Sequence, residues 1–371
     1  MSFTVNNTPA LSFAENFPDH ILSEVDAAVY LTVSLNNRPI VSDMKLIADS
    51  DKRIIVPIRQ LLRTTSALAR PKATTAPLPR ISIKSVKGDE SLTLGGWVLP
   101  GGIDEPASFE ISDFILRNFL TWQPQVLDTT AAQPQWLAFV RPYSWQRFEI
   151  FSSLHCVDGR KYTRQIASTP DTYTYTQIDT SFGGLWEAFC SERELSPLAY
   201  DVFGQAEKRV TSSDGVTTVV REQNCPMAQR YVLRPPREGE ECFGFVNTLG
   251  GFDTLMMQGA AILKPSGEIE TFTSREVERE LSSGYTSYWE ASTGYIDTEH
   301  AAAQYQDFLK SRDRWVFRAG RWLRIVVDEY KLEHTQHELN AYTFKYHLAE
   351  RNERRFYERS ELPEVELPII L

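Results

Sequence analysis

A chain of 371 residues exceeds the size at which one hydrophobic core usually stops growing, so the sequence predicts two or three domains. The formal net charge of −10 argues against nucleic acid as a direct ligand, because binding phosphates requires a basic surface. The first residues lack the basic and apolar regions of a secretion signal, and no apolar run approaches the ~20 residues of a membrane helix. We therefore expect a soluble protein that is made in the cytoplasm.

The N-terminal part of the chain predicts a small β domain. Alternating apolar residues begin at Val29, and the pair Asn36 and Asn37 tolerates the left-handed backbone of a tight turn between two strands. Between residues 64 and 80 the composition shifts to Thr, Ala, Pro and Arg, which is typical of an exposed connection. We place the first boundary here and assign residues 1–70 to the first domain.

Residues 71–190 predict a second, β-sandwich-like domain. Its clearest hairpin is 148–166, where two strand-like runs are joined at Asp158 and Gly159, a strong hairpin signal. The aromatic-rich segment 116–124 is suited to packing this block against a neighbour.

The third block, residues 191–371, again consists mainly of hairpins. Turn signals occur at 213–215, 265–267 and 318–321. One segment, 299–310, predicts a helix because its apolar residues recur at helical spacing and Thr298 can cap its first turn. The predicted fold class is therefore mainly β, with tandem β-sandwich-like domains and one or two short helices. The last residues, 364–371, end in an apolar run that we expect to be extended.

The segment 242–259 is the most informative stretch of the chain. Two apolar, strand-like runs flank a turn from Asn247 to Gly251, and we expect one face of this hairpin to be buried. We assign a structural role to Asn247, Gly250, Gly251 and Asp253, with the glycines supplying positive φ. The sequence predicts that Gly251→Val damages folding.

No motif for catalysis, a cofactor or a metal is evident. Serines lie in no nucleophile elbow, and the Gly-Gly pairs form neither a dinucleotide-binding fingerprint nor a phosphate-binding loop. His334 and His337 have a spacing that could hold a metal on a helix, but their surroundings favour a strand and no third ligand is near. The sequence therefore predicts no catalytic, cofactor-binding or metal-binding residues, and we expect the protein not to be an enzyme.

Two other residue types have more than one interpretation. The four cysteines, which lie far apart in the chain, fit isolated buried thiols better than a zinc site or disulfides: Cys156, Cys190, Cys225 and Cys242. Four aromatic residues near one another in sequence fit packing in a core or an interface, and alternatively a surface that stacks on a sugar ring: Tyr285, Tyr288, Trp289 and Tyr295.

The hairpin sequence from Phe243 to Leu255 resembles a hairpin of tail and baseplate proteins from phages and prophages of Bacteroides-type bacteria. Residues 119–124, followed by 133–139, resemble the second domain of that family, and 285–294 resemble its C-terminal part. The resemblance implies a virion structural protein, a distal-tail-like or baseplate component made in the host cytoplasm. It also implies a homo-oligomeric ring whose partners are other tail proteins, and it transfers no catalytic residues.

Two other functions stay open at this point. A carbohydrate- or receptor-binding protein of the tail tip would present Trp289 and its tyrosine neighbours to a cell-surface glycan. A polysaccharide-degrading enzyme would need two carboxylates at a fixed separation in a cleft, which the sequence alone cannot place.

Overall fold

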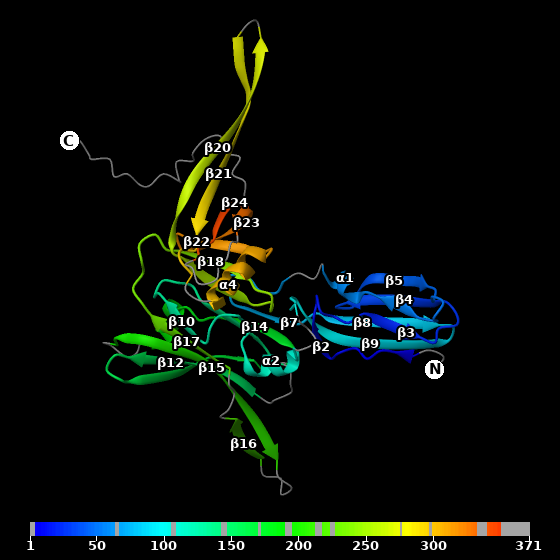
Figure 1. Ribbon diagram of the computed structural model, residues 1–371. Helices are drawn as coiled ribbons and strands as arrows, with labels where there is room; N and C mark the ends of the chain where they lie inside the picture. Colours follow the sequence, from blue (N-terminus) through cyan, green and yellow to red (C-terminus); the bar gives the residue numbers. More distant parts are fainter. Residues whose placement is uncertain are drawn as a thin grey trace, which may run out of the picture. The chain divides into compact units, whose positions relative to one another are not determined.

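The computed structural model describes residues 4–63, 67–104, 109–141, 147–169, 172–189, 195–211, 217–222, 227–274, 277–296, 299–331 and 340–349. These residues form mainly β-strands in several sheets, as the sequence predicts (Figure 1). The described part has four short helices rather than one or two: α1 (Ile58–Leu62), α2 (Ile111–Arg117), α3 (Phe182–Phe189) and α4 (Glu299–Lys310).

The chain divides into two compact units. Unit 1 comprises Met1–Arg237, Gly244–Leu255 and Ala302–Arg312, and unit 2 comprises Glu238–Phe243, Met256–Ala301 and Asp313–Leu371. The division passes through the hairpin 242–259: both of its ends belong to unit 2, and its middle, Gly244–Leu255, belongs to unit 1.

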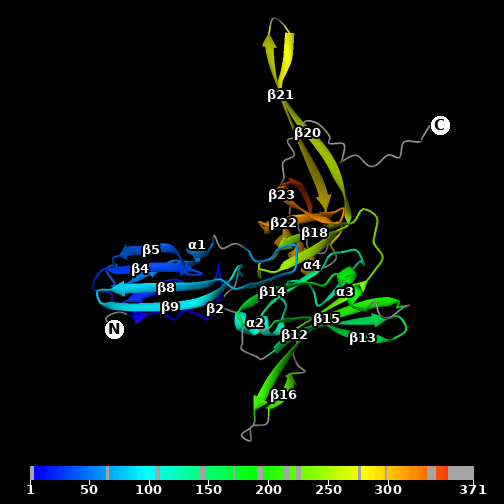
Figure 2. The same cartoon turned by 180° about the vertical axis from the view of Figure 1, so that it is seen from behind.

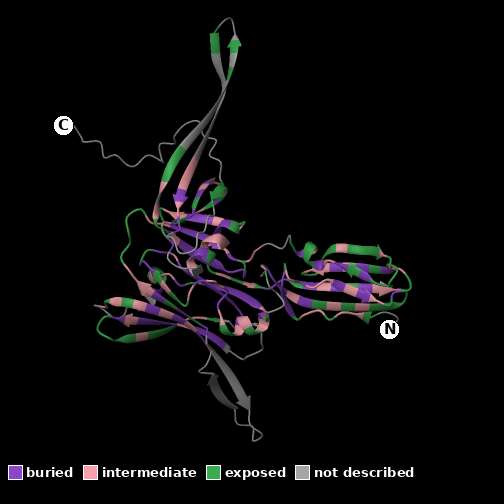
Figure 3. Ribbon diagram, in the orientation of Figure 1, coloured by how far each residue is buried: buried purple, intermediate pink, exposed green. Residues whose placement is uncertain are grey.

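The first sandwich of unit 1 consists of two sheets. One has the strand order β1 (Thr4–Val5), β3 (His20–Ser23), β6 (Ile54–Val56), and the other has the order β2 (Leu11–Phe13), β9 (Glu90–Leu99), β8 (Arg80–Lys87), β4 (Val29–Leu35), β5 (Arg38–Leu46). Leu22 and Val56 of the first sheet share a core with Leu31 and Ile83 of the second. Buried and less buried residues alternate along β4 and β8, because successive side chains of a strand point to opposite faces (Figure 3). The predicted turn between β4 and β5 is confirmed, with φ of 50° at Asn36 and 62° at Asn37.

The second sandwich of unit 1 has a three-stranded and a six-stranded sheet. The smaller sheet has the order β11 (Trp136–Val140), β14 (Thr174–Asp179), β7 (Thr74–Pro77). The larger has the order β10 (Val126–Thr129), β17 (Ala228–Leu233), β15 (Pro197–Thr211), β12 (Arg147–Cys156), β13 (Lys161–Thr169), with β16 (Thr217–Glu222) paired to β15. Phe139 of the smaller sheet and Tyr200 of the larger belong to one core, which also includes Leu185 of α3. The hairpin predicted at Asp158 and Gly159 is confirmed.

The sheets run across both predicted domain boundaries. Strand β4 pairs with β8 across residue 70, and β12 pairs with β15 across residue 190. The Pro-rich stretch that predicts a connection contains β7, which pairs with β14 about a hundred residues later. Pairing between strands that are distant in sequence leaves no mark on local composition, so composition misplaces these boundaries.

A seven-stranded sheet contains most of the described residues of unit 2. Its order is β19 (Phe252–Met257), β18 (Glu241–Val246), β22 (Arg314–Arg318), β23 (Arg321–Lys331), β24 (Thr343–Leu348), β21 (Val277–Ser292), β20 (Gly259–Ser274). The turn predicted at 318–321 is confirmed, with φ of 48° at Ala319 and 74° at Gly320. The turn predicted at 265–267 is wrong, because these residues pair within the long strand β20. A single Pro-Ser-Gly signal did not end that strand.

Three further predictions concern the ends of elements. The predicted helix 299–310 is confirmed with the same bounds, whereas its proposed cap Thr298 lies outside the described residues. The predicted turn 213–215 and the extended C-terminal run 364–371 also lie outside them.

Within the described part of the chain, none of the helices has the length and apolar character required to cross a membrane.

Candidate functional site

The turn between β18 and β19 is held by the side chain of Asn247. Its Oδ1 accepts a hydrogen bond from the amide of Gly251 at 2.9 Å. Its Nδ2 donates to the carbonyl of Leu120 at 2.9 Å and to Oδ2 of Asp253 at 2.8 Å. One buried amide thereby closes the turn and attaches it to the segment 119–123 of unit 1, the aromatic-rich segment that predicts a packing contact.

Asp253 is a buried carboxylate within the same cluster. Besides Asn247, the hydroxyl of Thr121 donates to its Oδ1 at 2.6 Å. Burial raises the pKa of Asp253 to about 7, although the hydrogen bonds from Thr121 and Asn247 act in the opposite direction. Asp307 of α4 accepts a hydrogen bond from the amide of Thr248 at 3.3 Å, and burial raises its pKa to about 6.

The two glycines of the turn are required for different reasons. Gly250 has φ of +79°, and a Cβ there would also collide with the carbonyl oxygen of Pro100. Gly251 has no such φ, but a Cβ would collide with the carbonyl oxygen of Leu120. Both faces of the flanking strands are buried rather than the single face that alternation predicts. The geometry indicates that this turn has a structural role, because its buried polar side chains are hydrogen-bonded within the protein.

A second group of polar residues lies on the larger sheet of the second sandwich. Strand register places five residues in one transverse row across β13, β12, β15, β17 and β10: Thr163, Ser153, Asp201, Arg230 and Val126. Their neighbours Leu154, Tyr200 and Tyr231 point to the opposite face, into the core. The row therefore occupies the outer face of this sheet.

Asp201 is the centre of this row, paired with Ser153 on one side and Arg230 on the other. The guanidinium of Arg230 donates to both carboxylate oxygens of Asp201, from Nε at 2.6 Å and from a terminal nitrogen at 2.9 Å. Nε2 of His155 lies 2.8 Å from Oδ2. Burial by itself would raise the pKa of Asp201, but the hydrogen bonds from Arg230 and His155 outweigh it and lower this pKa.

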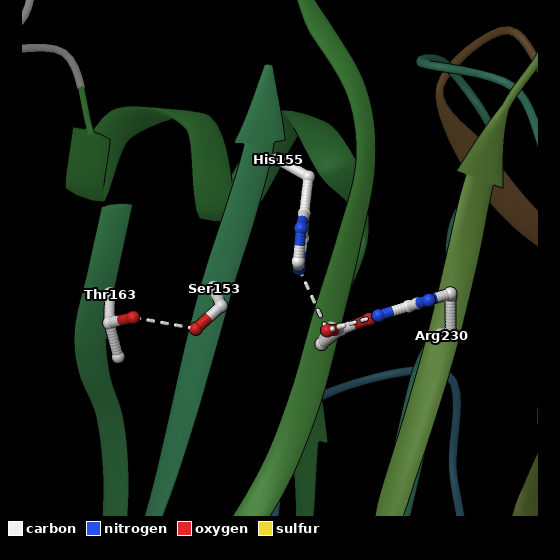
Figure 4. Close-up of polar contacts among 5 residues, drawn as sticks. Ser153, His155, Thr163 and Arg230 are labelled. Carbon is white, nitrogen blue, oxygen red and sulfur yellow. Dashed lines mark hydrogen bonds and ion pairs between the residues drawn. The ribbon is translucent and has the colours of Figure 1, made fainter. Parts of the chain in front are cut away.

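Ser153, His155 and Asp201 do not have the geometry of a catalytic triad. The hydroxyl of Ser153 is buried and lies 2.7 Å from Oγ1 of Thr163 (Figure 4). Nε2 of His155, the atom that would have to accept a proton from a nucleophile, faces Asp201. Sequence reasoning did not identify the group of His155, Asp201 and Arg230, because its members come from β12, β15 and β17, and the pairing of these strands is not visible in one sequence.

A pocket of about 430 Å³ adjoins the row. Phe203 lines it and stacks on Phe151, with ring centroids 5.8 Å apart and an angle of 20° between planes. Lys161 and Arg230 contribute positive charge to the lining, and Asp201 contributes the negative charge. The arrangement combines an aromatic surface with cationic donors, both of which can contact a ligand.

The aromatic residues that predict glycan stacking do not form one platform. Tyr288 and Trp289 are neighbours in β21 and therefore point to opposite faces of the sheet. Trp289 stacks on Tyr346 at 5.9 Å, and the guanidinium of Arg318 lies 4.8 Å from the Trp289 ring centroid. Tyr288 contacts the ring of His347. Trp289 thus has intramolecular partners, as the packing interpretation expects.

Other residues named from the sequence take the following positions. Tyr285 lies in β21, with its side chain outside the described residues, and Tyr295 is exposed after β21. Cys156 and Cys242 are buried thiols that form no disulfide within the described part of the chain, and burial raises the pKa of Cys242. Four residues lie outside the described part: Cys190, Cys225, His334 and His337. Among the residues that the structure describes, no group of three or more His, Cys, Asp or Glu side chains is placed to hold a metal.

No protein-family model matches the chain, and no curated protein matches it. Among solved structures, the chain is similar to invasin, a bacterial integrin-binding protein, with 10% identity over 79% of this chain and a TM-score of 0.20. It spans 56% of the invasin chain. It is also similar to the N-terminal four Ig domains of Dscam1 isoform 7.44, with 7% identity over 80% of this chain and 74% of that one, and a TM-score of 0.15.

Proposed function

We propose that this protein is a non-catalytic structural subunit of a phage tail or baseplate, which assembles with further copies of itself into a ring or sleeve. The resemblance of the hairpin 243–255 to tail proteins motivates the identity of the particle. The physical support comes from unit 2, where one long hairpin has a strand edge that no other described strand covers.

That hairpin consists of β20 and β21, which pair from Gly259 and Ser292 to Ser274 and Val277. Among the described residues, β24 pairs with Trp289–Ser292 of β21 and with no other part of that strand, and β20 is the last strand of its sheet. Both views show the hairpin extending beyond the other strands of this sheet (Figure 1, Figure 2). A two-stranded ribbon is only marginally stable in water by itself, so a partner that covers it would stabilise it.

The two edges of the hairpin differ in their capacity to pair. Pro265 of β20 has no N–H to donate, and proline is a common device that protects an edge strand from pairing. In β21, residues 277–288 lie outside the pairing with β24 and contain no proline. We infer that a neighbouring copy contacts this edge of β21. A contact of this kind, repeated by rotation, closes a ring.

Apolar side chains on the hairpin support the same conclusion. Ile262, Leu263 and Val277 are 58%, 51% and 54% exposed. Ile262 and Leu263 are adjacent in β20 and point to opposite faces, so both faces of the ribbon offer apolar surface. Exposed apolar groups on an unpaired ribbon are typical of a surface that is buried on assembly.

The test is a shortened hairpin in which residues 265–287 are replaced by Asn-Gly. Because Lys264 pairs with Tyr288, this deletion removes both strands at the same register and leaves a two-residue turn. We expect the full chain to form a defined oligomer by light scattering and electron microscopy, and the shortened chain to be a folded monomer. A shortened chain that assembles like the full chain would contradict the proposed role of the hairpin.

A further inference from the structure

We propose that the pocket on the outer face of the sheet β10–β17–β15–β12–β13 binds an anionic saccharide, through a carboxylate or sulfate group on the sugar. This site is separate from the hairpin β20–β21, and the inference does not depend on assembly.

The charge of the pocket differs from that of the chain. The protein has a formal net charge of −10, whereas the charged residues that line the pocket are Lys161, Arg230 and Asp201. Asp201 is already neutralised by Arg230 and faces His155. Lys161 is exposed and has no ion pair among the described residues. A local excess of positive charge in an acidic protein favours an anionic group at this place.

Arg230 is positioned to recognise such a group. Its two bonds to Asp201 fix the plane of the guanidinium, while the side chain remains 49% exposed. A guanidinium carries five N–H donors, so several remain for oxygen atoms of a ligand. Because Asp201 holds Arg230 before the ligand arrives, binding requires little ordering of this side chain.

The apolar part of the lining suits a sugar ring. Phe203, supported by its stacked neighbour Phe151, is half-buried, and Val126 is 57% exposed. A pyranose presents C–H groups on its face and hydroxyl groups at its rim. The face can pack on Phe203 and Val126 while the rim reaches polar groups such as the exposed amide of Gln125.

An acidic peptide fits this position less well. Peptides that bind β-sheets commonly add a strand to a free edge. The pocket lies over β15, which pairs with β12 on one side and β17 on the other. Its main-chain groups are therefore occupied, and recognition must come from side chains, as is usual for saccharides.

The experiment measures binding of hexasaccharides to the full chain by calorimetry. The probes are unsulfated chondroitin, which carries only carboxylates, chondroitin 6-sulfate, and neutral chitohexaose, with hexaglutamate as an anionic peptide. We expect binding of one or both chondroitins and at least tenfold weaker binding of the other two. Equal binding of chitohexaose or hexaglutamate, or no chondroitin binding, would overturn the proposal.

Variants locate the site. Lys161→Gln is expected to weaken chondroitin binding at least tenfold without affecting the fold, because Lys161 has no ion pair among the described residues that its loss would break. Arg164→Gln is the matched control, because Arg164 lies in the same strand and does not line the pocket. Equal affinity of Lys161→Gln and the wild type, or an equal loss in Arg164→Gln, would place binding elsewhere. The shortened hairpin should bind as the wild type does, which separates this inference from the proposed assembly.

Discussion

The Nδ2 atom of Asn247 donates a hydrogen bond of 2.8 Å to Oδ2 of Asp253, across the turn that joins β18 to β19. Both residues are buried, and the same Nδ2 also donates to Leu120. Two polar side chains in the hairpin 242–259 are thus explained by the need to close and attach one turn. The first predictions concern the effect of substitutions in this cluster on the stability of unit 1.

Asn247→Ala is expected to lower the free energy of unfolding of unit 1 by roughly 3 kcal/mol or more. The substitution leaves three buried groups without their partner, each at a cost of about 1–3 kcal/mol. The control is Asn118→Ala, which removes one half-buried side-chain bond, to the carbonyl of Phe114, and should cost about 1 kcal/mol. Equal losses in urea titrations of the two variants would contradict the role of Asn247.

Gly251→Ala should already disturb folding, and Gly251→Val should do so more strongly. A Cβ at Gly251 collides with a backbone carbonyl, which cannot move without shifting the segment around Leu120. We expect a fall in melting temperature of about 10 °C or more, or an insoluble protein. Gly159→Ala is the control, because it has φ of +83° but open space, and should cost only about 1–2 kcal/mol. A normal melting temperature for Gly251→Val would show that the backbone at Gly251 does not lie close to the carbonyl oxygen of Leu120.

The stability of unit 1 should depend on pH through Asp253. Between the ordinary value of 3.8 and the folded pKa of about 7, the folded protein keeps a proton that the unfolded chain has lost. Asp253 therefore contributes stability at low pH that is lost as pH rises through about 7, on the order of 4 kcal/mol in total. Asp307, with a pKa of about 6, acts in the same direction.

The charging of His20 changes the stability in the opposite direction with pH. The test therefore compares the wild type with Asp253→Asn. Burial lowers the pKa of His20 to about 4, and its charging therefore destabilises the fold as pH falls below 6.5. Both the wild type and Asp253→Asn contain His20, which cancels in their difference. We expect the wild type to gain stability relative to Asp253→Asn when the pH is lowered from 7.5 to 4.5. Parallel pH profiles of the two proteins in urea titrations would exclude the raised pKa of Asp253.

Trp289 provides a test between packing and glycan stacking. Because its ring stacks on Tyr346 and contacts the guanidinium of Arg318, Trp289→Ala should cost about 2 kcal/mol of stability in unit 2. Tyr330→Ala, at a 48% exposed aromatic residue of β23 in the same sheet, should cost less than about 1 kcal/mol. A Trp289→Ala protein of unchanged stability that loses binding on a glycan array would favour the glycan-stacking interpretation instead.

Local signals predicted local structure well. The turns at Asn36, Gly159 and Gly320 have the positive φ that their residue types indicate, and the helix 299–310 has the predicted bounds. In each case the information lies within a few residues of the chain, in the steric freedom of Asn and Gly or in helical spacing.

What the sequence did not predict depends on distant contacts. Strand β7 can form in a Pro-rich stretch because it is an edge strand, and the strand that it pairs with lies far along the chain. The row centred on Asp201 requires the register of five strands, which one sequence does not contain. The requirement for glycine at position 251 comes from Leu120, more than a hundred residues earlier, and not from the turn itself.

The most direct test of the proposed function is the mass of the protein in solution, measured by light scattering for the full chain and for the chain in which Asn-Gly replaces residues 265–287. The proposal predicts a closed oligomer of the full chain and a monomer of the shortened chain with an unchanged melting temperature. A full chain that stays monomeric at all concentrations, and is absent from purified phage particles, would contradict it.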